Sequence, residues 1–212
     1  MLELAVKSLI AYLMGAILGA LILGVLIGVD IRTQGSGNAG GTNALRTQGK
    51  WFAFGVMLID VGKGWLAVAW LPLLAWPTPS VELDPQWLRA ACALAVTLGH
   101  IYPVWFEFRG GKGVATVLGV VIGLSPVYVL PLLSIWAGIV LLTGFVSLGS
   151  MFAVSALPIM AAWRDPSDPA LISAFFVLAV LVIFAHRANV LRLFEGTESR
   201  LRRGRSVKPS AP

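Results

Sequence analysis

The sequence predicts an all-α integral membrane protein with seven transmembrane helices, its N-terminus outside and its C-terminus in the cytoplasm. Three observations lead to this fold class. Of the 212 residues, 58% are hydrophobic and only 12% are charged, roughly half the charged share of a soluble domain. The mean hydropathy is +0.85, and the apolar residues gather in long blocks. The net charge of +6 comes almost entirely from the C-terminal end.

The apolar blocks cover residues 4–29, 51–76, 88–106, 114–163 and 170–186. At about 20 residues per helical span, every block except the fourth is expected to form one helix. The first block is long for the apolar region of a signal peptide and is therefore expected to be a retained helix. The fourth block has fifty residues without a charge and must cross more than once.

The basic residues decide how often it crosses. Loops 30–50 and 107–113 are two spans apart, so they share a side, and both are basic, as are seven Lys and Arg after residue 186. The positive-inside rule places them all in the cytoplasm. The fourth block must then cross an odd number of times, and three crossings fit its length.

Helix-interrupting residues predict where the fourth block turns. Pro and clustered Gly and Ser occur at 123–126 and 143–150. The helix over 114–124 is then only about 17 Å long at 1.5 Å per residue. We expect one seven-span domain over 1–198 and a basic, disordered cytoplasmic tail over 199–212, which either lies on anionic lipid or serves only as a topology signal.

The first polar segment with possible chemistry is GSGNAGGTNALR at 35–46. Its glycines free the backbone to turn several N–H groups toward one anion. Arg46 adds a planar fork suited to two phosphate oxygens, and Ser36, Asn38, Thr42 and Asn43 add neutral hydrogen-bonding groups. The alternative is a flexible polar turn between two spans.

The second segment is GHIYPVWFEFRGGKGVAT at 99–116. Lys112 lies between glycines at a predicted helix start, where its charge and the N-terminal amides can both meet a phosphate. A nucleotide-binding P-loop is excluded, because Gly rather than Ser or Thr follows Lys112 and no strand precedes it. A loop that only carries topology charges is the alternative. His100 is a catalytic candidate or a satisfied histidine at a helix end.

Three weaker candidates follow. VSLGS at 146–150 fits close helix packing equally well, and His186 with Asn189 fits a helix-end anchor. Asp60 and Lys63 are three residues apart and can pair on one face of a helix. A structural ion pair is favoured there over a functional one, although charges inside a membrane are often functional.

The polar groups able to bind an anion all belong to the cytoplasmic side, where two cationic glycine-rich segments could hold phosphate while grooves between spans admit an acyl chain. The pattern favours chemistry that joins a phosphorylated, water-soluble molecule to a fatty chain. A small transporter or channel for a phosphorylated or anionic solute is the main alternative. It predicts repeats and polar groups near the midplane, which the sequence does not show. A non-catalytic scaffold leaves the paired cationic loops unexplained.

The sequence resembles the bacterial acyl-phosphate-dependent glycerol-3-phosphate acyltransferases over about residues 8–198. The likeness rests on the segments 35–46, 99–116 and 146–150 described above, on DVGKG at 60–64 and on HRANVLRLFEGTE at 186–198. The order and spacing of these five segments along the chain make the match specific. It implies a multi-pass protein of the bacterial cell (inner) membrane with its active site facing the cytoplasm. The implied reaction is acyl transfer from acyl phosphate to the 1-hydroxyl of glycerol 3-phosphate, giving lysophosphatidate and inorganic phosphate in the first acylation step of phospholipid biosynthesis.

The resemblance also implies which residues form the site. The catalytic candidates are His186, Asn189 and Ser147. The candidates for phosphate binding are Ser36, Gly37, Asn38, Gly40, Gly41, Thr42, Asn43, Arg46, Gly110, Gly111, Lys112 and Gly113. Further candidates for substrate binding are His100, Arg109 and Ser150.

The implied substrates are glycerol 3-phosphate and a long-chain acyl phosphate. No cofactor, metal, coenzyme A, nucleic acid or required protein partner is implied, and Cys92, the one cysteine, offers no Cys-based metal site. An acyl phosphate is a mixed anhydride with a good leaving group, so orientation, charge neutralisation and oxyanion stabilisation suffice. The general base is either His186, which titrates near neutrality, or a phosphate oxygen of the substrate.

Overall fold

The computed structural model describes residues 1–75 and 84–201, and every regular element in these ranges is helical. The α-helices are α1 (Leu2–Gly15), α2 (Gly19–Leu26), α3 (Gly41–Gln48), α4 (Lys50–Ala69), α5 (Pro85–Ile101), α6 (Val114–Leu124), α7 (Val129–Thr143), α8 (Val146–Arg164), α9 (Pro169–Ala185) and α10 (Arg187–Phe194). Short 3-10 turns lie at Ile31–Thr33, Leu71–Leu73, Val104–Phe106 and Pro126–Tyr128.

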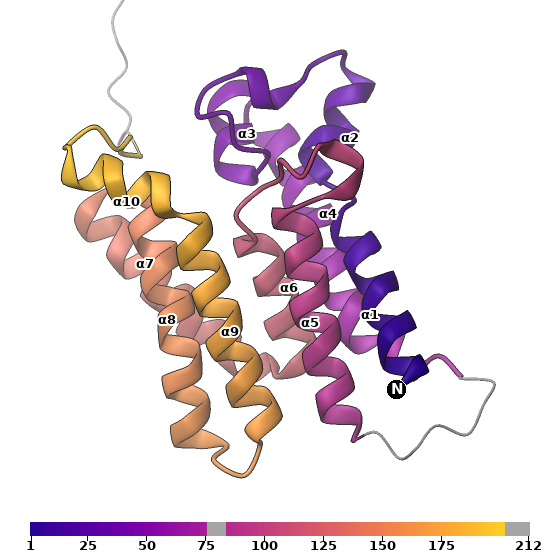
Figure 1. Ribbon diagram of the computed structural model, residues 1–212. Coiled ribbons are helices and arrows are strands. Elements are labelled where there is room, and N and C mark those ends of the chain that lie inside the picture. The colour runs from indigo at the N-terminus through magenta and orange to yellow at the C-terminus, as the bar shows by residue number, and fades with distance from the viewer. Residues whose placement is uncertain (76–83, 202–212) are drawn as a thin grey trace, which may run out of the picture.

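The helices form two groups that pack side by side (Figure 1). Helices α1, α4, α5 and α6 pack in one group, while α7, α8 and α9 form the other, and α5 contacts α9 between them. Helices α3 and α10 lie at one end of the bundle, and the N-terminus lies at the other. The polar segments of the sequence therefore share one end.

Three helical stretches are long and apolar enough to cross a membrane: Lys50–Leu73, Pro126–Thr143 and Val146–Arg164. If the bent pairs α1 with α2 and α9 with α10 each count as one span, there are five. The predicted short helix is confirmed, because α6 has only 11 residues. Seven spans, and the orientation of the termini, stay predictions.

The expectation of one helix over 4–29 was wrong, because the chain breaks after Gly15 and α2 is bent by 46° from α1. The charged pair inside α4 stabilises this break. Lys63 Nζ donates to the carbonyl oxygens of Gly15 at 2.9 Å and Ile17 at 2.7 Å, and Asp60 Oδ1 accepts from Gly19 N–H at 3.2 Å. These side chains satisfy the backbone groups that a helix break leaves without partners.

The other boundaries agree in part. A break at 123–126 is confirmed: α6 ends at Leu124, and Pro126 opens a 3-10 turn. The break over 143–150 was too long, because Gly144 alone adopts a left-handed φ of 80° and α8 starts at Val146. The third block also ends earlier than predicted, since α5 stops at Ile101.

Glycines let two helix pairs approach closely. A Cβ on Gly15 of α1 or on Gly99 of α5 would lie 2.0 Å from a carbonyl oxygen of the other helix. The same holds between α4 and α6, where a Cβ on Gly64 would lie 2.2 Å from Thr116 O and one on Gly119 would lie 2.0 Å from Val61 O. Such backbone contact is how membrane helices associate when apolar burial offers little advantage over lipid. It holds the short α6 firmly against α4.

Candidate active site

A cavity of about 290 Å³ opens at the end of the bundle that carries α3 and α10. Its polar lining comes from α3 and the loop before it, from α4 and the end of α5, from the residues just before α6, from the start of α8, and from His186, α10 and the residues after α10. The rest of its lining is apolar. The polar lining includes Ser36, Asn38, Thr42, Asn43, Arg46, Asp60, His100, Lys112, Ser147, Ser150, His186, Asn189, Arg192, Glu198 and Ser199, with Gly40, Gly41 and Gly113 beside them.

The first glycine-rich segment is only partly a loop, which corrects the expectation for 35–46. Its second half is α3, which begins at Gly41 with Gly40 as its N-cap. Gly40, Gly41 and Thr42 line the cavity, so the free N–H groups of this helix terminus lie at its wall. Helix N-termini attract anions, and this supports the predicted anion site by a different geometry.

Asn43 fixes the loop that precedes α3. Its Oδ1 accepts from Ser36 N–H at 2.9 Å, and its Nδ2 donates to Ile31 O at 3.2 Å and to Gln34 O at 3.0 Å. Because the polar atoms of this buried side chain are engaged with the loop backbone, its role is to hold the loop. Arg46, one turn later, is exposed and donates to Ser199 O at 3.3 Å.

Lys112 and the C-terminal residues form one polar network. Lys112 Nζ donates to Asn189 Oδ1, 77 residues away in sequence. Glu198 Oε1 accepts from Asn189 Nδ2 at 2.7 Å and from Ser147 Oγ at 2.6 Å. Glu198 Oε2 accepts from Arg192 Nε at 2.8 Å. Residues from the segments 99–116, 146–150 and 186–198 therefore meet in one network.

Sequence reasoning missed Arg192 and Glu198, which were counted only as charges near the tail. A signal was available for Arg192, since it lies three residues after Asn189 and thus on the same face of α10. Glu198 returns to the cavity because Gly196 adopts a φ of 70° and reverses the chain. The N–H groups of Thr197 and Glu198 then both donate to Arg192 O.

Cations outnumber carboxylates around the network. Burial lowers the pKa of Lys112, the nearby Arg192 and Arg46 also lower it, and Glu198 raises it, which together leave the pKa at about 8. Burial by itself would raise the pKa of Glu198, but hydrogen bonds from Ser147, Asn189 and Arg192 outweigh it and lower the pKa. Around the ionised Glu198, three cations leave a positive surplus that suits a doubly charged phosphate.

His186 is held in one tautomer at the hinge between α9 and α10. Its Nδ1 lies 2.8 Å from Val182 O. A carbonyl oxygen can only accept, so Nδ1 carries the proton and, in the neutral ring, Nε2 keeps its lone pair. The buried ring lines the cavity.

Asp60 and Lys63 form the ion pair that their spacing predicted, with Lys63 Nζ 3.0 Å from Asp60 Oδ1. Both side chains are buried. His100 joins them, because its Nδ1 lies 2.9 Å from Lys63 Nζ. Asp60 and His100 also line the cavity. Ser150 lines it too, although its hydroxyl donates to Val146 O of its own helix.

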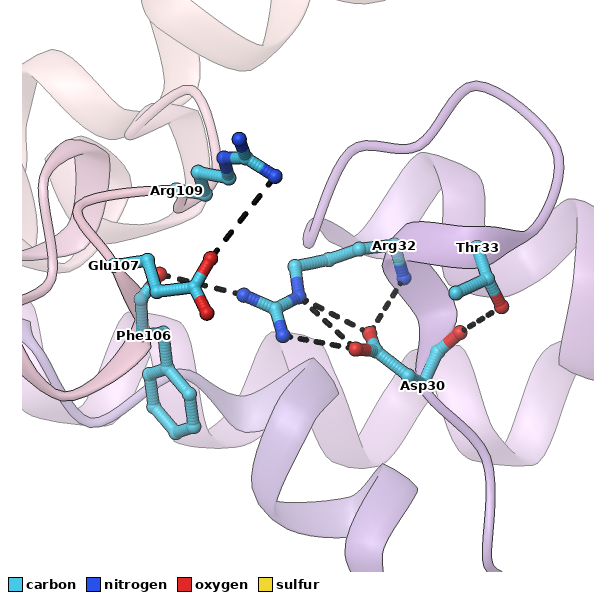
Figure 2. A network of polar contacts seen from close by, with 6 residues as sticks. All are labelled: Asp30, Arg32, Thr33, Phe106, Glu107 and Arg109. Atoms are coloured by element: carbon cyan, nitrogen blue, oxygen red, sulfur yellow. Dashed lines mark hydrogen bonds and ion pairs between the residues drawn. The ribbon is translucent and has the colours of Figure 1, made fainter.

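Four predicted site residues do not line the cavity. Arg109 lies at the surface, with Nη1 4.0 Å from Glu107 Oε2 (Figure 2). Gly37 serves a turn, with a φ of 70°. Gly110 and Gly111 pack against His100, where a Cβ on either would lie about 2 Å from an atom of that residue. The backbone turns their Cα atoms toward α5, and their role as phosphate contacts stays a prediction.

Arg32, which the sequence marked only as a topology charge, ties the two cationic loops together (Figure 2). Its Nη1 donates to Phe106 O at 3.3 Å, and its guanidinium lies 6.0 Å from the centre of the Phe106 ring. Asp30 holds the same guanidinium through Nε and Nη2. The segment leading to α3 and the segment leading to Lys112 are thereby joined.

In residues 1–75 and 84–201, no group of three or more His, Cys, Asp or Glu side chains could hold a metal ion. The polar side chains that line the cavity are cations, amides, hydroxyls and imidazoles, together with the two carboxylates of Glu198 and Asp60. This set suits an anionic substrate.

Comparison with known proteins identifies the family. The family model for glycerol-3-phosphate acyltransferase matches residues 5–196. Glycerol-3-phosphate acyltransferase of Geobacter sulfurreducens is 42% identical over 95% of this chain and 100% of its own length. Glycerol-3-phosphate acyltransferase 2 of Bacillus cereus is 41% identical over 90% of this chain and 91% of its own length.

Solved structures agree. The crystal structure of PlsY (YgiH), an integral membrane glycerol 3-phosphate acyltransferase, in its glycerol 3-phosphate form has a TM-score of 0.82 and 35% identity, covering 93% of this chain and 94% of that one. Its lysophosphatidic acid form has a TM-score of 0.81. The chain is thus an integral membrane protein, and it belongs to the glycerol-3-phosphate acyltransferase family.

Proposed function

We propose that the protein transfers an acyl group from a long-chain acyl phosphate to the 1-hydroxyl of glycerol 3-phosphate, releasing lysophosphatidate and inorganic phosphate. One observation carries this proposal: the same cavity has a cationic polar part and an apolar part. The polar part includes Arg46, Lys112 and Arg192. The apolar part is lined by residues from three helices, namely Val114, Val117, Leu118, Leu132, Leu133, Trp136, Ala153 and Val154.

Each part of the reaction has a group to serve it. Lys112, Arg46 and the N-terminus of α3 bind phosphate oxygens and neutralise their charge, which lowers the cost of bringing two anions together. The 1-hydroxyl oxygen attacks the acyl carbon, and the bond from that carbon to the phosphate oxygen breaks. Asn189 and Ser147 orient the glycerol phosphate. An apolar site for the chain keeps water from the reactive anhydride.

Two groups can accept the hydroxyl proton. His186 presents an unprotonated Nε2 because Val182 O fixes its tautomer, and a phosphate oxygen of the substrate is the other acceptor. His186→Gln separates them. If His186 is the base, kcat falls by about 10² or more with little change in KM. A loss below about fivefold would assign the proton to the substrate phosphate.

The membrane arrangement belongs to the proposal. Seven spans with the cavity facing the cytoplasm of a bacterial inner membrane fit the basic loops and the opposite ends occupied by α3 and the N-terminus. Thr33 and Ser167 are exposed loop residues away from the cavity. In a Cys92→Ala background, a membrane-impermeant maleimide added to spheroplasts should label Ser167→Cys and spare Thr33→Cys. The reverse pattern would invert the topology.

The function is tested with purified protein, glycerol 3-phosphate and palmitoyl phosphate. We expect release of inorganic phosphate in equal amount to the lysophosphatidate formed. Lys112→Ala should reduce turnover by about 10² or more, because it leaves a phosphate without its buried cation. Lys50→Ala is the matched control, since Lys50 is a cation at the same end that lies over Trp51 and outside the cavity.

Two results would contradict the proposal. If the wild-type protein releases phosphate no faster than Lys112→Ala, the proposed enzyme function is refuted. Acyl transfer from palmitoyl coenzyme A, with none from palmitoyl phosphate, would show that the acyl donor is not an acyl phosphate. The transporter alternative predicts uptake of glycerol 3-phosphate into proteoliposomes without any acyl donor, and we expect none.

A further inference from the structure

We propose that Asp60, Lys63 and His100 form a positioning network that holds Lys112 in place for the substrate phosphate. The three side chains touch one another inside the bundle, and His100 touches the loop that carries Lys112. This inference rests on the proposed function, because it assigns the network's purpose to phosphate binding by Lys112. The network is distinct from the residues proposed to contact the reacting groups.

Lys63 is the centre of the network. Its ammonium lies 3.0 Å from Asp60 Oδ1, 2.9 Å from His100 Nδ1, and within 2.9 Å of the carbonyl oxygens of Gly15 and Ile17. It therefore joins the break between α1 and α2 to α4 and to the end of α5. An ammonium group has only donors, so it fixes the direction of every hydrogen bond it makes.

That direction decides the tautomer of His100. Because Lys63 donates, Nδ1 of His100 accepts, and the proton of the neutral ring lies on Nε2. Asp60 Oδ1 is 3.6 Å from Nδ1, beyond hydrogen-bond distance. The protonated Nε2 lies against the loop, where a Cβ on Gly111 would be only 2.1 Å away. The ring therefore packs directly on the backbone of the residue before Lys112.

The loop is held to α5 on both sides of this contact. Gly111 N–H donates to His100 O at 3.1 Å, and Gly110 N–H donates to Ile101 O at 3.2 Å. Gly113 packs on the same helix, since its Cβ would meet Thr97 at 3.1 Å. Lys112 is thus carried by a backbone whose neighbours on both sides rest on one turn of α5. A shift of His100 must move Lys112.

A second buried lysine provides the matched control. Lys7 of α1 is 2% exposed, pairs with Glu3 at 2.7 Å, and donates to the carbonyl oxygens of Pro72 and Leu74. Like Lys63, it satisfies backbone carbonyls at a helix end through a buried ammonium. It lies outside the cavity lining, whereas Asp60 and His100 form part of that lining. Its loss should affect folding alone.

The experiment compares kinetic constants of purified, folded variants for both substrates. Asp60→Asn combined with Lys63→Met removes both charges, so that neither remains buried without its partner. His100→Asn retains an acceptor near Lys63 but does not reach the loop. In both variants we expect KM for glycerol 3-phosphate to rise by about tenfold or more, because small displacements of a binding group are costly. KM for palmitoyl phosphate should change less than twofold.

The outcomes are separable. A purely structural network predicts less folded protein with both KM values unchanged, as expected for Lys7→Met, and that result would overturn the inference. An equal rise in both KM values would also overturn it. If the double variant does not fold, His100→Asn decides by itself. Unchanged KM for glycerol 3-phosphate in Lys112→Met would instead refute the proposed phosphate role of Lys112.

Discussion

Lys112 should make the capture of glycerol 3-phosphate fail at alkaline pH. Burial and the neighbouring Arg192 lower the pKa of Lys112 to about 8, against about 10.4 for a free lysine. Below pH 8 the side chain is protonated and attracts phosphate, and above it the charge is lost. The phosphate of the substrate, with a second pKa near 6, is mainly doubly charged at pH 7 and above. Glu198 also stays ionised, because its pKa is lowered.

The size of the effect follows from the titration. In the free enzyme, kcat/KM for glycerol 3-phosphate should fall with a slope of one above pH 8, which is about tenfold by pH 9. Initial rates of phosphate release from pH 6.5 to 9.5 measure this, after subtraction of the spontaneous hydrolysis of acyl phosphate. Lys112→Arg should move the decline beyond the measured range, because a guanidinium stays protonated.

Two results would refute the reasoning. A flat kcat/KM between pH 7.5 and 9.5 would show that Lys112 keeps its proton or does not bind phosphate. An unchanged decline in an active Lys112→Arg variant would assign the titration to another group. A circular dichroism spectrum that is constant over the same pH range is the control for unfolding.

Three further predictions follow from the same geometry. Glu198→Gln should move the alkaline decline below pH 8, because the ionised carboxylate raises the pKa of Lys112; an unmoved decline would contradict their coupling. Arg109→Ala should keep kcat/KM within about twofold, as expected for an exposed surface pair, and a larger loss would return Arg109 to the site. Gly64→Ala should lower the free energy of unfolding in detergent by about 1–3 kcal/mol through overpacking. Gly138→Ala is the control and should not lower it, because the space at its Cβ is open. Equal effects of the two substitutions would refute the close packing of α4 on α6.

Much of the fold could be predicted because its signals are local. The apolar blocks, the turn at 123–126 and the short helix over 114–124 each follow from composition or helix-breaking residues within a few positions. The break after Gly15 could not be predicted, because the charged pair that stabilises it lies on α4, more than forty residues later. Helical propensity at 16–18 gives no sign of it.

The site divides in the same way. Arg46, Lys112 and Asn189 were found because each belongs to a polar segment inside an apolar chain, and such segments are rare enough to be noticed. Glu198 was missed, because its place in the cavity depends on a chain reversal at Gly196 and on three donors from two helices. Arg109 was included as a site residue but lies at the surface, since sequence proximity to Lys112 does not say which way a loop residue points.

The sequence by itself determined that this is a helical membrane protein whose polar groups gather at one end, because hydropathy and charge act on each segment separately. Only the tertiary structure decided which of those groups share a cavity. Lys112 and Asn189 are in contact although 77 residues separate them, and Arg109, three residues from Lys112, faces solvent. Contacts of this kind arise from helix packing, which brings distant segments together through close glycine contacts and buried charges that no local pattern records.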